Sequence, residues 1–245
     1  RSLIQNVRVA LAAEARTLTA GDVYIRSDQP FEAETRSLIK ARLTELGNVE
    51  TTETLDLTTM VRLSTSDSVS TKLVELRGVQ PEFPFYGEFR LGGEKSYSFD
   101  LFRDNGALVG PELLTQLELS VGDIIAIGDM EFTIRDVLLN EPGRQLGGFS
   151  FGPRVLVAYE AVAGTGLLRL GSRAERQVLL KVPTEGQIDL LVDQLRQDLT
   201  GTFARVGSYR RTETRIERNF DQAENYLSLV GFVIVILGGI GIWSV

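Results

Sequence analysis

The stretch VLLKVPTEGQIDLLVDQLRQDLTGTFARV, residues 178–206, contains one complete strand–helix–strand unit. Aliphatic residues over 178–182 predict a strand that ends at Pro183. Apolar side chains then recur at helical spacing and predict a helix over 185–199, followed by a strand over 203–206. The apolar face of this helix consists of Ile188, Leu191, Val192, Leu195 and Leu199.

The same order of elements recurs near the start of the chain. A strand over 23–26 precedes a helix over 31–46, and another strand begins near Val49. In the later unit, Thr184 and Gln187 match a capping box at the start of the helix. The face of the earlier helix consists of Phe31, Leu38, Ile39, Leu43 and Leu46. Two such units predict a split βαβ, ferredoxin-like subdomain.

Residues 80–170 separate the two units and differ from them in composition. Long strands over 49–63 and 69–79 extend the first sheet before this segment begins. The segment itself is rich in Phe, Tyr, Gly and Pro, with a short helix over 111–119 and a β-hairpin over 123–138. The sequence therefore predicts an α+β fold in which a β-rich subdomain is inserted into the split βαβ subdomain.

The C-terminal stretch 226–245, YLSLVGFVIVILGGIGIWSV, contains no charged residue. As a helix rising about 1.5 Å per residue it would be about 30 Å long, the thickness of a bilayer core. We therefore expect a transmembrane helix, with a buried helix of a soluble core as the alternative. Gly231, Gly238 and Gly241 fall near one face, where they either pack against another membrane helix or are merely tolerated.

Helical stripes flank the predicted domain at both ends. Leu3, Val7 and Leu11 lie on one face of a helix over residues 1–20, and a similar stripe predicts one continuous helix over 209–245. We expect two stalk helices that rise from a membrane and carry the domain, although a helix packed flat on the domain is the alternative for 1–20. Both ends of the sequence look like cuts in a longer chain.

Composition excludes several classes of chemistry. The chain has no histidine and no cysteine, so imidazole bases, thiolate nucleophiles and His or Cys metal sites are absent. Gly148-Phe149-Ser150-Phe151-Gly152 matches G-x-S-x-G, but Ser150 has no histidine base. No P-loop for ATP occurs, and the net charge of −7 argues against nucleic acid. We expect no catalytic, cofactor-binding or metal-binding residue in this chain.

Two aromatic loops remain as candidate contact sites. Dense aromatic side chains beside Gly and Pro suit a loop that contacts an apolar substrate or a partner protein. Alternatively, these side chains fill the seam between the two subdomains. The candidate residues are Phe83, Phe85, Tyr86 and Phe89 in the first loop, and Phe149 and Phe151 in the second.

The order of these segments resembles the extracytoplasmic domain of the MacB/FtsX-like ABC transporter permeases, most closely the YbbP-type branch. No single motif is diagnostic, but their order and spacing extend along nearly the whole chain. The matching segments are Glu14-Ala15-Arg16, Val74–Val79, Phe83–Gly87, Gly148–Val155, Arg173–Arg176 and Asn225–Gly231 leading to Leu237–Gly241.

The resemblance implies a domain in the periplasm, anchored in the bacterial inner membrane. The expected division is a stalk helix (1–20), a porter subdomain (21–79 and 171–207), an inserted Sabre subdomain (80–170), a second stalk helix (208–225) and a transmembrane helix (226–245).

The resemblance also implies that ATP and Mg²⁺ are bound by a separate cytoplasmic ATPase subunit. The stalks would pass ATP-driven motion to the domain, which would extract or export a hydrophobic lipid, ester, lipoprotein or drug. Further partners would be membrane lipid and a second periplasmic domain of the same permease or a second copy. The alternative is an FtsX-like interaction module that recruits or activates a periplasmic enzyme.

Overall fold

The computed structural model describes residues 3–63, 70–93, 96–143, 152–169 and 172–214. The chain divides into two compact units, of which residues 16–208 form one and residues 1–15 with 209–245 form the other. The helices are α1 (Leu3–Thr19), α2 (Ala33–Leu46), α3 (Pro111–Leu117), α4 (Tyr159–Gly164) and α5 (Ile188–Asp198), with 3-10 turns η1 (Phe99–Phe102) and η2 (Glu185–Gln187). The strands are β1 (Val23–Ser27), β2 (Glu50–Leu63), β3 (Thr71–Val79), β4 (Arg90–Leu91), β5 (Gly106–Val109), β6 (Ile124–Ile127), β7 (Met130–Asn140), β8 (Arg154–Ala158), β9 (Ala174–Lys181) and β10 (Arg205–Ser208).

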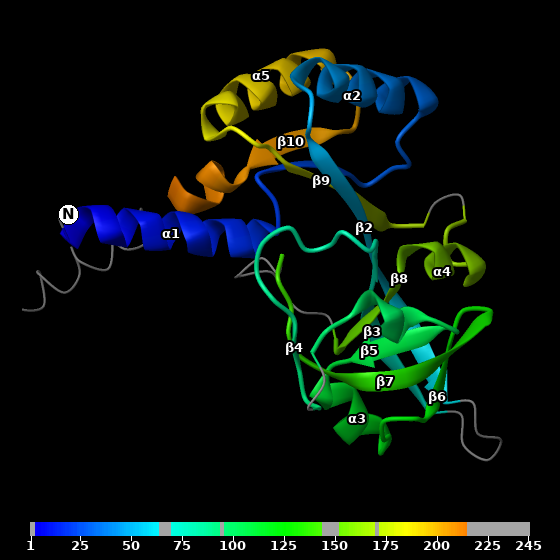
Figure 1. The fold of residues 1–245 in the computed structure, drawn as a ribbon. Helices are drawn as coiled ribbons and strands as arrows, with labels where there is room; N and C mark the ends of the chain where they lie inside the picture. The colour runs from blue at the N-terminus through cyan, green and yellow to red at the C-terminus, as the bar shows by residue number, and fades with distance from the viewer. Residues whose placement is uncertain (1–2, 64–69, 94–95, 144–151, 170–171, 215–245) are drawn as a thin grey trace, which may run out of the picture. The chain divides into compact units, whose positions relative to one another are not determined.

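Both predicted strand–helix–strand units are present, and their strands alternate in one sheet. The order is β10-β1-β9-β2, and every neighbouring pair is antiparallel. Helices α2 and α5 lie on the same face of these strands (Figure 1). The amphipathic pattern of α5 explains its place, because four of its aliphatic side chains are buried against the sheet. They are Ile188, Leu191, Val192 and Leu195.

The predicted capping box is wrong. The side chain of Thr184 makes no capping hydrogen bond. The amide of Gln187 instead donates to the backbone carbonyl of Thr184, at 3.0 Å, which closes the 3-10 turn η2. The α-helix therefore begins only at Ile188.

The remaining strands close into a barrel. Strand β2 pairs with β3, β3 with β8, β8 with β5, β5 with β7, β7 with β6, and β6 pairs back with β2. The predicted hairpin is confirmed as β6–β7, and the helix predicted at 111–119 is confirmed as α3. Alternate residues of each strand point inward and form one apolar core, as expected for a small closed barrel. The buried strand residues are Leu55, Val61, Val74, Leu76, Ala107, Val109, Ile125, Ile127, Phe132, Ile134, Val155 and Val157.

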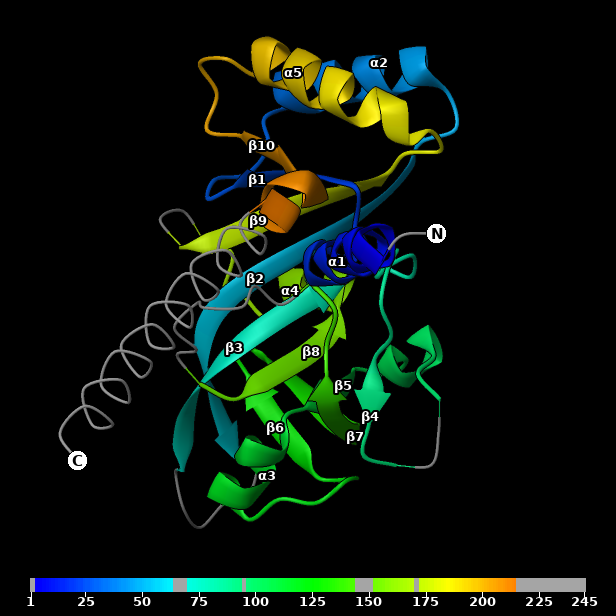
Figure 2. The ribbon, with the colours of Figure 1, turned by 90° about the vertical axis from the view of Figure 1, so that its left-hand side faces the viewer.

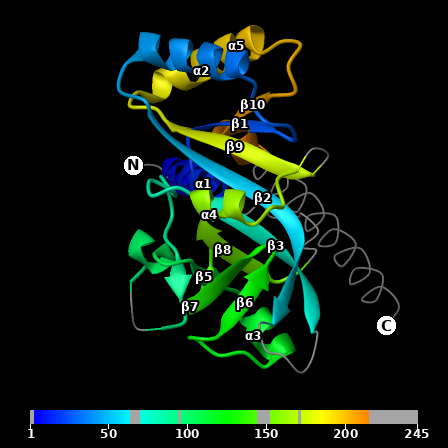
Figure 3. The ribbon, with the colours of Figure 1, turned by 90° about the vertical axis from the view of Figure 1, so that its right-hand side faces the viewer.

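Strand β2 is shared by both parts of this unit (Figures 2 and 3). Residues 50–57 pair with β9, residues 54–62 pair with β3, and residues 61–63 pair with β6. The barrel therefore takes β2 and β3 from the segment that precedes residue 80. Its other strands follow that point in the sequence.

The terminal helices are described only in part. Residues 209–214 are helical. The rest of the second predicted stalk, and the predicted transmembrane helix over 226–245, lie outside the described residues. Within the described ranges, no helix combines the length and the apolar character needed to cross a membrane.

Candidate functional site at the foot of α1

Helix α1 ends in a tightly packed junction with the strands. Ala20 adopts a left-handed conformation, with φ of 57°, and is fully buried. This conformation is energetically unfavourable for a residue with a Cβ, so it persists only where surrounding contacts stabilise it. The carbonyl of Ala20 accepts a hydrogen bond from the amide of Phe85 at 3.2 Å, and the amide of Gly143 donates to the carbonyl of Thr17 at 2.9 Å. Two distant loops thus fix the end of the helix.

Asp22, two residues further along, is the centre of the junction. Its side chain is fully buried, and its carboxylate accepts three hydrogen bonds from three separate segments. Arg16 Nε donates to Oδ1 at 3.0 Å, while the hydroxyl of Tyr86 and the amide of Val182 each donate to Oδ2 at 2.9 Å. Arg16 also pairs with Glu185. A buried carboxylate is stable only when it is paired in this way.

The first aromatic loop packs against this junction. Phe83 and Phe89 are 2% and 8% exposed, and their ring centroids lie 5.8 Å apart in a shared core. Phe85 and Tyr86 are half-buried, and the Arg16 guanidinium lies 5.4 Å from the Tyr86 ring centroid. Phe83 and Phe89 thus occupy the interior, as the packing alternative expects. The contact role stays a prediction for this loop.

The other predicted site residues fall outside the described part of the chain. These are Phe149 and Phe151 of the second aromatic loop and the candidate helix-packing residues Gly231, Gly238 and Gly241. Ser150 falls there too.

Gly87 lets the aromatic loop approach α1 closely. Its φ is +86°, and a Cβ at this position would lie 2.8 Å from Thr17 Cγ2 and 2.9 Å from Pro142 Cβ. A larger residue would therefore collide with both segments as well as strain the backbone. The loop at 83–89, the turn at 142–143 and the end of α1 form one contact region.

A buried ionic cluster lies where the chain enters and leaves the segment 142–153. Arg77 on β3 donates to Asp56 on β2 (Nε–Oδ1 2.6 Å, Nη2–Oδ2 3.1 Å) and to Glu141 Oε1 (Nη1, 2.6 Å). Arg154 on β8 pairs with Glu75 Oε2 at 3.2 Å and with Glu141 Oε2 at 3.6 Å. Glu141 immediately precedes this segment and Arg154 immediately follows it. Because both side chains pair with residues of β3, the two positions that flank the segment are held beside β3.

The charges in this cluster depend on one another. Burial by itself lowers the pKa of Arg77, but attraction to Asp56 and Glu141 outweighs it, so the pKa is raised overall. The arginine is therefore permanently charged. Removing either carboxylate would leave Arg77 with one partner in place of two inside the protein.

Sequence reasoning missed the two centres of these networks. Asp22 and Glu141 stand in no motif, and their partners lie far along the chain. Arg16 and Arg154 do lie in segments that match the family pattern, so the resemblance indicated part of each network. In the described ranges, no group of three acidic side chains is placed to hold a metal ion.

The family model described as MacB-like periplasmic core domain matches residues 2–198. An uncharacterized ABC transporter permease, YbbP of Escherichia coli strain K12, is 23% identical over 233 residues, which is 93% of this chain and 26% of the relative. This chain therefore spans about a quarter of the length of that relative.

Among solved structures, the periplasmic region of MacB from Actinobacillus actinomycetemcomitans aligns with a TM-score of 0.51 and 12% identity. The alignment covers 85% of this chain and 98% of that one. The extracellular domain of the ABC-type transporter YknZ from Gram-positive bacteria aligns at 0.48 and 11% identity, covering 76% of this chain and 100% of that one.

The MacB structure shares the α+β fold described above, and the family model extends from α1 to the end of α5. This chain belongs to the MacB-like periplasmic core domain family.

Proposed function

We propose that this chain is the part of an ABC transporter permease that receives ATP-driven motion through its stalk helices and acts on a hydrophobic substrate in the periplasm. The subunit that binds ATP and Mg²⁺ is a separate cytoplasmic ATPase, and the permease is anchored in the inner membrane. The strands of 16–208 form the porter and Sabre subdomains, and the unit does no chemistry of its own.

The observation that carries this proposal is the junction at Asp22. A helix that only tethers a domain needs no more than a flexible connection. Here residues 16–22, which include the last turn of α1 and the buried Asp22 just after it, are bonded to the aromatic loop, to the turn at 142–143 and to the end of β9. Such a connection has few soft degrees of freedom, so a movement that reaches residues 16–22 would be passed on to the strands that they contact.

Spin labels test this coupling directly, because the chain has no native cysteine. Ala10→Cys on α1 and Leu190→Cys on α5 place nitroxides at two exposed positions in the complete permease with its ATPase. Pulsed electron resonance measures the distance between them without nucleotide and after trapping with ATP and vanadate. We expect nucleotide to shift the distance distribution.

The same measurement is then made with Tyr86→Phe, which removes one hydrogen bond to Asp22 and keeps the ring. We expect a smaller or broader shift while ATP turnover stays within about twofold. The matched control is Tyr97→Phe, whose hydroxyl makes no hydrogen bond within the described residues. A distance that does not respond to nucleotide contradicts the proposal, as does an equal response in all three proteins.

A further inference from the structure

The two helices that cover the sheet are packed unequally. Helix α5 buries four aliphatic side chains, whereas α2 buries only Thr35 and Ile39. Leu38, predicted to face the core, is 38% exposed. The strands beneath α2 present small side chains such as Thr51 and Val178. The chain therefore leaves the space under α2 incompletely filled.

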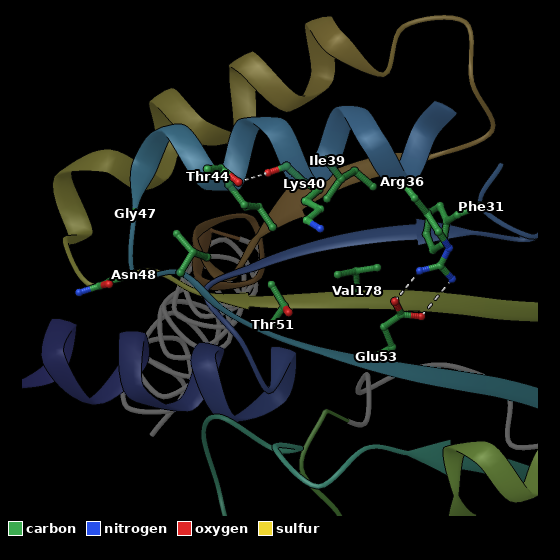
Figure 4. A pocket seen from close by; sticks show the side chains of 12 residues that line it. Phe31, Arg36, Ile39, Lys40, Thr44, Gly47, Asn48, Thr51, Glu53 and Val178 are labelled. Carbon is green, nitrogen blue, oxygen red and sulfur yellow. Dashed lines mark hydrogen bonds and ion pairs between the residues drawn. The ribbon is translucent and has the colours of Figure 1, made fainter. Parts of the chain in front are cut away.

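That space is a cavity of about 680 Å³ between α2 and strands β2 and β9 (Figure 4). Its volume lies within the range of about 300–1,000 Å³ that is usual for small-molecule sites. The walls are mainly apolar, and their apolar side chains are Phe31, Ile39, Leu43, Val49 and Val178. The space is open to solvent, because Lys40 and Thr51 on its walls are exposed, so its apolar side chains form a surface that an apolar occupant would cover.

The polar groups of the cavity are arranged unevenly. At one end, Arg36 is held by Glu53, with Nη1–Oε1 of 2.7 Å and Nη2–Oε2 of 3.3 Å, and its guanidinium lies 5.6 Å from the Phe31 ring centroid. Glu53 also accepts a hydrogen bond from Tyr159. These bonds raise the pKa of Arg36 and fix this end of the cavity.

Lys40 stands one turn further along α2 and has no such neutralisation. Its side chain points from the helix toward the strands (Figure 4), and it makes no ion pair with any residue that the structure describes. A lysine ammonium is charged at neutral pH and carries three donors. An apolar cavity with one unneutralised cation is complementary to a molecule with an apolar body and one negative group.

We propose that this cavity binds an amphipathic monoanion, such as a fatty acid, with its tail against the apolar walls and its carboxylate at Lys40. The inference does not rest on the proposed transport function, because binding here requires neither ATP nor the stalk helices.

The test uses the full 245-residue chain in lipid nanodiscs without any ATPase. The probe is dodecanoic acid with a diazirine near the end of its tail, and labelled peptides are identified by mass spectrometry. We expect saturable labelling of peptides from α2 and β9 that excess unlabelled dodecanoic acid displaces. The methyl ester of the probe should label these peptides about tenfold more weakly, because it lacks the charge.

Three variants separate the parts of the inference. Lys40→Met keeps the aliphatic stem, removes the cation and should bring labelling by the acid down about tenfold, to the level of the ester. Thr51→Trp fills the cavity from an exposed position and should abolish labelling by both probes. Lys72→Met on β3 removes a matched lysine of the barrel and should leave labelling unchanged. Circular dichroism checks that each variant is folded.

Several outcomes would overturn the inference. Labelling that does not saturate means that the probe only partitions into lipid near the chain. Equal labelling in Lys40→Met, Thr51→Trp and the unmodified chain places the probe elsewhere. Equal labelling by acid and ester, or loss in Thr51→Trp with no change in Lys40→Met, means that the cavity does not select an anion.

Discussion

Replacing Asp22 by Asn removes the charge at the foot of α1 and keeps the size of the side chain. An asparagine has one acceptor oxygen, and its amide is a donor, so it cannot accept from Arg16, Tyr86 and Val182 together. The cheaper orientation keeps the oxygen toward Tyr86 and Val182 and turns the amide toward Arg16, whose side chain is 20% exposed and still reaches Glu185. The variant then loses one charge-assisted bond and weakens two others.

A hydrogen bond to a charged group contributes about 1.5–3 kcal/mol, and breaking a buried ion pair from one side costs about 3–5 kcal/mol. Because Arg16 keeps its second partner, we expect a loss near the lower limit, about 3 kcal/mol in the free energy of unfolding. That is a large share of the total of about 5–15 kcal/mol of a typical domain.

Urea unfolding of the chain in mild detergent, followed by circular dichroism, measures the change. The matched control is Asp28→Asn, which removes the same charge from an exposed pair with Arg205 and should cost less than about 1 kcal/mol. Hydrogen exchange gives a local readout, since the amide of Val182 should exchange faster only in Asp22→Asn. If the two variants lose equal stability, Asp22 is not the centre of the junction.

Three further predictions use the same denaturation measurement. Arg77→Met should cost about 3–5 kcal/mol, because it leaves the buried carboxylate of Glu141 with only its longer pairing to Arg154, at 3.6 Å; a loss below about 1 kcal/mol would contradict the buried cluster. Gly106→Ala should cost about 1–3 kcal/mol because the new Cβ would overlap the backbone carbonyl oxygen of Leu101, whereas Gly186→Ala, with open space around it, should be tolerated. The guanidinium of Arg42 lowers the pKa of Asp198 from 3.8, so the stability that this pair contributes is present above pH 4 and lost as the pH falls through the lowered pKa. The difference between the unmodified chain and Arg42→Met should therefore shrink in acid; a difference independent of pH would contradict this.

Local patterns predicted the elements well because each has its own periodicity. The apolar stripe over 185–199 identifies α5 without any knowledge of its neighbours, and the turn at 128–129 identifies the β6–β7 hairpin. Element ends were less accurate. The strand predicted at 178–182 begins at Ala174, because its pairing with β2 continues past the apolar run.

The candidate site was harder to predict because its contacts are long-range. Asp22 and Tyr86 are bonded across the fold, and nothing near Asp22 in the sequence marks it as buried. The aromatic loop was visible from composition alone. Composition does not distinguish a side chain that faces a substrate from one that fills a seam, and only the structure places Phe83 in the core and leaves Phe85 half-buried.

The double role of β2 limits how these domains can be recombined. A chimera that exchanges residues 80–170 with a relative would receive strands β5, β6, β7 and β8 from that relative and keep its own β2 and β3. Side chains from the two proteins would then have to pack together in one core. The barrel would therefore not transfer as an independent unit. Successful exchange would have to include residues 54–79 as well, and β9 would then pair with foreign residues at positions 54–57 of β2.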